Sequence, residues 1–202
     1  MERLRNIRGN GAVNTIKHRG TVRLETGRLI LRRFTEDDLV PVFQNCWSDN
    51  EVWKWTNYKP MHCIEDVLTS ANMFTKKWLE AYDRPSRYSW AIQCKESGEV
   101  IGRLFGMHPD DDISQVELAY ELGRRWWNQG IMTEAVKAGI DFFFREVGFN
   151  RVHAYHADKN PASGRVMQKC GMKYEATLRQ ACLCNNGLFD KVCYSILTEE
   201  YT

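Results

Sequence analysis

One stretch in the middle of the chain combines the residue types that bind anions. Gly123–Ala135 reads GRRWWNQGIMTEA and lies between the alternating run Val116–Leu122 and a helical pattern over Glu134–Phe144. This order predicts a strand that turns tightly through Asn128-Gln129-Gly130 into a helix. The first turn of a helix presents unpaired backbone N–H groups at the positive end of the helix dipole. The stretch therefore predicts an anion site that suits a pyrophosphate, and with it a cofactor derived from a nucleotide.

The elements before this turn follow helical and extended patterns in succession. Thr35 is a suitable helix N-cap, with Asp37 and Asp38 in the first turn, and we expect that helix to run to about Asn45. Ile64–Tyr82 places apolar residues along one helical face. The alternating runs that predict strands are Leu29–Phe34, Arg87–Cys94, Val100–Met107 and Ile113–Leu122, and the middle two form a hairpin.

The elements after the turn add a strand between two helices and a closing hairpin. The helices are expected over Thr133–Val147 and Ala162–Lys169, and the strands over Arg151–Ala157, Met172–Leu183 and Lys191–Leu197. Antiparallel strands, then a strand–helix–strand unit, then a final hairpin together predict an α+β fold built on a mixed sheet.

The composition indicates one globular domain with neither a nucleic acid nor a membrane as partner. The chain has 202 residues, 43% of them hydrophobic, which is enough for one well-buried domain. A net charge of +2 gives no basis for binding nucleic acid or an anionic membrane, and no apolar run reaches the length of a membrane span. Seven scattered cysteines without a secretory signal indicate reduced thiols in the cytoplasm and no metal site.

Four motifs occur along the chain in a familiar order: LETGRLILRRFTEDD, ELAYELGRRWWNQGIMTEA, DKNPASGRVMQKCGMKYE and GLFDKVCYSIL. In this order they resemble the GCN5-related N-acetyltransferases (GNAT family), and specifically the branch similar to the ribosomal-protein N-terminal (alanine or serine) acetyltransferases. The resemblance covers roughly Leu24 to Tyr201. It implies an acetyltransferase domain over 24–202, with an α/β/α mixed sheet of about seven strands, a V-shaped splay and about four main helices. Residues 1–23 would then be a flexible basic extension, or alternatively a targeting or RNA-contacting arm.

The resemblance identifies the predicted anion site as a coenzyme A pyrophosphate site. The family's motif of Arg or Gln, two residues, Gly, one residue and Gly or Ala falls on Arg125–Gly130, with Asn128 at the first glycine position. Asn is the non-glycine residue that best tolerates the left-handed conformation, so we expect the turn to survive. An ordinary strand–turn–helix corner is the alternative. The cofactor-binding residues that the resemblance implies are Glu121 and Leu122 on the strand edge beside pantetheine, Arg125, Asn128, Gln129, Gly130, Ile131, Met132 and Thr133 around the pyrophosphate, and Asn160 beside pantetheine.

The implied chemistry is acyl transfer from acetyl-CoA to an amine. A neutral amine attacks the thioester carbonyl and the thiolate leaves, so the site needs a base, a donor for the oxyanion and an acid for the thiolate. Asn160 and Ser163 match the family's N-x-x-S, which places Ser163 near the sulfur as a candidate acid. The alternative is that Ser163 is an ordinary first-turn residue and Asn160 a helix cap.

The catalytic base is where the sequence departs from the ribosomal-protein acetyltransferases. The glutamate that these relatives are thought to use matches Cys182, or a residue next to it, and a thiol is a poor base for this role. We expect Glu117, on the strand before the phosphate turn, to act as the base instead. The alternative is that Glu117 faces solvent and pairs with Lys or Arg. A site without a strong general base favours an acceptor amine of low pKa, such as an α-amine, because more of it is neutral at pH 7.

The acceptor is expected under the loop between the first two helices. Trp53, Trp55 and Tyr58 could stack on it or hold its ammonium, or simply pack the loop onto the sheet, while Trp126 and Trp127 should pack around the cofactor turn. We therefore expect an acetyl-CoA-dependent N-acetyltransferase acting on a primary amine, in particular a peptide N-terminus, as a monomer or homodimer. The alternatives are a small-amine acetyltransferase (polyamine, amino acid or aminoglycoside) and an acyl-CoA sensor with little turnover.

Overall fold

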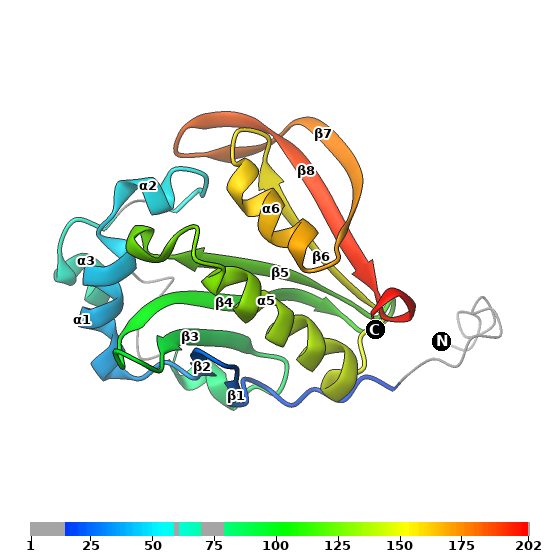
Figure 1. Ribbon diagram of the computed structural model, residues 1–202, viewed down its shortest axis with the longest axis horizontal. Coiled ribbons are helices and arrows are strands. Elements are labelled where there is room, and N and C mark those ends of the chain that lie inside the picture. Colours follow the sequence, from blue (N-terminus) through cyan, green and yellow to red (C-terminus); the bar gives the residue numbers. More distant parts are fainter. Residues whose placement is uncertain (1–14, 59–60, 70–78, 202) are drawn as a thin grey trace.

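The predicted alternating runs join into one mixed sheet. The computed structural model describes residues 15–58, 61–69 and 79–201, and Figure 1 shows its elements. Within these described residues the sheet has eight strands in the order β1-β2-β3-β4-β5-β6-β8-β7, one more than expected because the two-residue β1 pairs with β2. The strands are β1 (Leu24–Glu25), β2 (Leu29–Arg32), β3 (Tyr88–Cys94), β4 (Val100–Asp110), β5 (Gln115–Leu122), β6 (Arg151–Ala157), β7 (Lys173–Cys184) and β8 (Gly187–Leu197).

Helices cover both faces of this sheet. Trp90 and Ile92 of β3 pack in one apolar cluster with the long helix α5, whereas Ala91 between them packs in a second cluster with Val42 and Trp47. Neighbouring residues of a strand point to opposite faces, so α5 covers one face and the segment around α1 the other. The described α-helices are α1 (Leu39–Val42), α2 (Asn50–Trp53), α3 (Ile64–Thr69), α5 (Ile131–Phe142), which a π-helical turn over Phe143–Val147 extends, and α6 (Pro161–Lys169).

The first expected helix is broken into short turns. A 3₁₀ turn over Glu36–Asp38 leads into α1, and a π-helical turn over Phe43–Trp47 follows it. Pro41 lies inside this segment; it has no N–H to donate and its ring crowds the preceding turn, which explains why a regular helix does not form. The second expected helix, 64–82, is observed as α3 and as a 3₁₀ turn over Ala81–Asp83, and its middle part, 70–78, lies outside the described residues.

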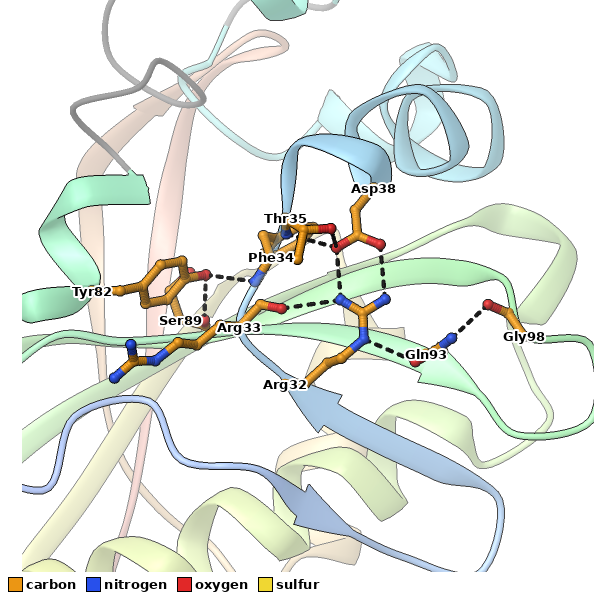
Figure 2. A network of polar contacts seen from close by, with 9 residues as sticks. All are labelled: Arg32, Arg33, Phe34, Thr35, Asp38, Tyr82, Ser89, Gln93 and Gly98. Carbon is orange, nitrogen blue, oxygen red and sulfur yellow. Dashed lines mark hydrogen bonds and ion pairs between the residues drawn. The ribbon is translucent and has the colours of Figure 1, made fainter.

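A polar network fixes the start of the α1 segment on the sheet (Figure 2). Both oxygens of Asp38 accept from the guanidinium of Arg32, at 2.6 and 2.8 Å, and the same carboxylate accepts the N–H of Thr35 at 2.8 Å. Burial alone would raise the pKa of Asp38, but the hydrogen bonds from Arg32 and Thr35 outweigh it and hold that pKa below its usual range. The hydroxyl of Tyr82 accepts the N–H of Phe34 and donates to the carbonyl of β3 residue Ser89. The predicted N-cap at Thr35 is confirmed.

Strands β5 and β6 part halfway along their length. They are the one parallel pair in the described sheet, and their pairing ends at Glu117 opposite His153. Beyond that point β5 continues beside β4 to Leu122, and β6 continues beside β8 to Ala157. This is the expected V-shaped splay, and it leaves the edge of β5 after Glu117 without a strand partner.

Residues 15–23 of the basic N-terminal segment lie along the domain. Lys17 donates its N–H to the carbonyl of Val147, and Gly20 donates to the carbonyl of Pro85. Residues 1–14 lie outside the described part of the chain. No helix in the described residues is long and apolar enough to span a membrane.

Candidate active site

The turn before α5 has the predicted backbone geometry. Asn128 adopts a left-handed conformation with φ of 59°, as Gly130 does with φ of 73°, so the expectation for Asn128 is confirmed. The N–H of Glu134 donates to the carbonyl of Gly130 at 3.0 Å and closes the first helical turn. The N–H groups of the three residues between them (Ile131, Met132 and Thr133) find no acceptor among the residues that the structure describes.

Arg28, on the other side of the turn, holds the carboxylate of Glu134 away from these N–H groups. The carboxylate of Glu134 accepts from Thr26 at 2.5 Å and from Arg28 Nε at 2.7 Å, and Arg28 also donates to the carbonyl of Gln129. Burial would raise the pKa of Glu134, but these hydrogen bonds outweigh it and lower that pKa. Because the nearby carboxylate is neutralised on the far side, the N–H groups remain suited to a pyrophosphate. No local pattern in the sequence predicts this role for Arg28.

A cleft of about 1050 Å³ runs from this turn across the splay of β5 and β6 to the loop after α2. Arg125 and Gln129 do not line it: both are exposed, and Arg125 stacks on the ring of Trp126. No group of three or more metal-binding side chains occurs in the described part of the chain. The predicted site residues that line the cleft together are Glu117, Glu121, Leu122, Asn128, Gly130, Ile131, Met132, Thr133, Asn160 and Ser163.

The β5 residues at the cofactor end of the cleft have partners of their own. The Glu121 carboxylate is buried, lies 3.1 Å from Arg103 Nε and accepts the indole N–H of Trp47 at 2.7 Å. The carbonyl of Leu122 accepts the indole N–H of Trp127 at 2.7 Å. The side chain of Glu121 therefore holds the α1 segment to the sheet and is not free to contact a ligand.

Ser163 is hydrogen-bonded to Tyr120, a residue that the sequence analysis did not select. The Tyr120 hydroxyl donates to the carbonyl of Ser163 at 3.0 Å and lies 2.9 Å from its Oγ. A tyrosine hydroxyl has one proton, so the Ser163 hydroxyl donates to the Tyr120 oxygen in this arrangement. Burial raises the pKa of Tyr120, which keeps it protonated at neutral pH. Asn160 occupies the N-cap position of α6, but its side chain makes no capping hydrogen bond and lines the cleft.

Glu117 is the carboxylate that faces the cleft without a partner. Its residue is 9% exposed, and no hydrogen bond or ion pair joins its side chain to any residue the structure describes. Burial raises the pKa of Glu117, and the nearby Lys191 and His108 offset part of that rise. Burial also lowers the pKa of His153, beside it on β6, to about 4, so this imidazole is neutral at pH 7. The alternative of a solvent-facing residue paired with Lys or Arg is therefore not observed.

At the acceptor end, one of the predicted aromatic residues is buried in the core and two line the cleft. Trp53 is fully buried and its indole donates to the carbonyl of Trp47, so of the two alternatives for this residue the structure shows packing. Trp55 and Tyr58 line the cleft, as does Cys182. On the same face the ammonium of Lys191 lies 3.9 Å from the centre of the Tyr155 ring. Of the three aromatic residues considered for the acceptor, Trp55 and Tyr58 remain available to a ligand.

Comparisons with known proteins agree with this geometry. The acetyltransferase (GNAT) domain profile matches residues 28–173. The chain is 32% identical to an uncharacterized N-acetyltransferase, p20, of Bacillus licheniformis, over 88% of this chain and 97% of that protein. It is 23% identical to the ribosomal protein uS5 alanine N-acetyltransferase of Escherichia coli, over 90% of this chain and 93% of that protein.

A solved structure shows the same fold. A GCN5-related N-acetyltransferase from Brucella melitensis aligns with a TM-score of 0.78 at 18% identity, over 93% of this chain and 84% of that one. The left-handed turn, the α5 N–H groups that have no acceptor within the described residues, and the splayed β5 edge are thus found in a chain whose sequence carries the family profile. The protein belongs to the GNAT family and is an acetyl-CoA-dependent N-acetyltransferase.

Proposed function

We propose that this enzyme acetylates the α-amine of a protein N-terminus by direct attack of the amine on the thioester. The observation that carries the proposal is the Glu117 carboxylate, which is buried at the cleft wall without a partner among the described residues. A carboxylate in that state is available to accept the proton that an amine must lose. Burial raises its pKa, which makes it a stronger base than an exposed glutamate.

A carboxylate base such as Glu117 favours an acceptor amine of low pKa. An α-amine with a pKa of about 8 is roughly 10% neutral at pH 7, whereas a lysine or polyamine nitrogen near 10.4 is neutral about 0.04% of the time. The difference amounts to roughly 3.5 kcal/mol, which a single carboxylate of modest pKa would have to supply. The similarity to the ribosomal protein uS5 alanine N-acetyltransferase of Escherichia coli supports the same acceptor class.

Other residues that line the cleft would bind the cofactor and hydrogen-bond to the leaving group. Acetyl-CoA supplies an acetyl group already activated as a thioester. The N–H groups of Ile131–Thr133 would hold its pyrophosphate at the N-terminus of α5. Ser163 would lie beside the departing sulfur, and its hydroxyl would turn its proton from the Tyr120 oxygen to the sulfur to hydrogen-bond to it.

The test measures thiol release from acetyl-CoA with a panel of amines. The panel contains a peptide with a free N-terminal alanine, the same peptide with a blocked N-terminus and an internal lysine, spermidine and an aminoglycoside. We expect thiol release with the free N-terminus and none with the blocked peptide, and mass spectrometry should locate the acetyl group on the α-amine.

Other outcomes would redirect the assignment. Thiol release with spermidine or the aminoglycoside but not with the free N-terminus would show that the acceptor is a small amine. Tight binding of acetyl-CoA without release from any amine would refute the enzymatic proposal in favour of an acyl-CoA sensor.

A further inference from the structure

Two segments far apart in the sequence line the acceptor end of the cleft and contact each other. One is the loop after α2, which contributes Trp55 and Tyr58, and the other is the end of the β7–β8 hairpin, which contributes Leu183 and Phe189. Both segments lie on the same cleft as Glu117, so an amine that enters at this end contacts them. How the loop is held against the hairpin therefore affects which amines fit.

Asn185, in the turn of the hairpin, bonds directly to the loop. Its backbone N–H donates to the carbonyl of Thr56 at 2.8 Å. Its side-chain amide donates to the carbonyls of Trp53, at 2.9 Å, and Tyr58, at 2.5 Å. Three hydrogen bonds thus connect one residue of the hairpin to three carbonyls of a single loop.

The chemistry of this contact requires an amide side chain. The Asn185 Nδ2 group has two N–H donors, and each is used by a separate carbonyl. An aspartate in its place would direct a carboxylate at two carbonyl oxygens, and an alanine would leave only the backbone hydrogen bond. The loop is also packed against the hairpin, because Trp55 contacts the apolar cluster of Ala157, Cys184 and Phe189.

We propose that Asn185 is a specificity-determining residue that ties the α2 loop to the β7–β8 hairpin and so sets the width of the amine that the cleft admits. The inference rests on the proposed function in that the acceptor enters the cleft past these two segments. Cofactor binding is separate, because the α5 turn lies at the other end of the cleft and makes no hydrogen bond to Asn185.

The tie itself is tested without any acceptor. Hydrogen–deuterium exchange of the amides of residues 53–58 is compared in the wild type, Asn185→Ala and Asn185→Asp. Asn186→Ala is the matched control, since Asn186 is the exposed neighbour in the same turn and its side chain makes no hydrogen bond to the described residues. Loss of two hydrogen bonds should speed exchange of these amides by about fivefold or more in both Asn185 variants, and the control should match the wild type.

The effect on specificity is tested with two peptides that differ in the first residue, alanine or tryptophan. The ratio of kcat/KM for the tryptophan peptide to that for the alanine peptide should rise by about threefold or more in Asn185→Ala, with the KM for acetyl-CoA unchanged. If the wild type acetylates another amine instead, a narrow and a wide member of that class replace the peptides.

Three results would overturn the inference. They are unchanged exchange in the Asn185 variants, an unchanged ratio despite faster exchange, and an equal change in Asn186→Ala. Absence of turnover with every amine would refute the proposed function alone, because the exchange measurement still decides whether the tie exists.

Discussion

The replacement Glu117→Gln separates a general base from a merely buried carboxylate. Glutamine keeps the size of the side chain but cannot accept a proton. Glu117 has no ion pair in the described residues that the substitution would break, so the fold should tolerate it. Burial raises the pKa of Glu117, so the wild-type kcat/KM should fall at acid pH along a limb that lies above the usual glutamate pKa of 4.5.

The size of the effect follows from the protonation of the acceptor. Without the base only the neutral amine reacts, and an α-amine with a pKa of about 8 is neutral in roughly 1% of molecules at pH 6. The variant should therefore lose about 100-fold in kcat/KM at pH 6, or about 2.7 kcal/mol. The ratio of the wild-type kcat/KM to that of the variant should approach one above about pH 9, where the amine is neutral and needs no base.

The assay is the pH dependence of kcat/KM for a peptide with a free N-terminal alanine. Glu51→Gln is the matched control, because Glu51 also lines the cleft but is exposed and paired with Lys54 at 3.3 Å. Lys191→Met should move the wild-type acid limb to higher pH, because Lys191 lowers the pKa of Glu117. A Glu117→Gln variant with the wild-type rate and acid limb at pH 6 would refute the assignment of the base.

Three further changes test contacts that the structure places around the site. Tyr120→Phe should lower kcat severalfold and the free energy of unfolding by about 1–3 kcal/mol, measured by kinetics and urea denaturation, because it removes both hydrogen bonds between the Tyr120 hydroxyl and Ser163. Asp38→Asn should lower the unfolding free energy by about 1–3 kcal/mol at pH 7, because it breaks the pair with Arg32. Since the pKa of Asp38 is lowered in the fold, urea denaturation should show this difference shrinking as the pH falls below about 4. Gly123→Ala should lower the Tm by several degrees, because a Cβ there would meet a backbone carbonyl and an indole ring.

The parts of the site that the sequence predicted are those set by neighbours along the chain. The left-handed conformation of Asn128 follows from the tight strand-to-helix turn, and the strand pattern follows from alternation with period two. The broken α1 segment was not predicted, although Pro41 supplied a signal within the segment itself. A local pattern therefore predicted the cofactor turn well and a helix interrupted by proline poorly.

The contacts that the sequence did not predict join residues far apart in the chain. Tyr120 reaches Ser163, and Asn185 reaches the α2 loop, only after the sheet has assembled. Trp53 illustrates the same limit, since its type suits either a ligand or the core, and only the position of Trp47 decides for the core. Type and spacing along the chain carry no information on these partners.

The two glutamates of β5 show most directly how partners assign function. Glu117 and Glu121 are four residues apart on one strand, so they point to the same face of the sheet. Glu121 meets a guanidinium and an indole N–H from other elements, and its charge is used to hold the α1 segment to the sheet. Glu117 meets no such group in the described residues, so its charge remains available to a ligand in the cleft. Two identical side chains on one strand face thus differ in function because the residues packed opposite them differ.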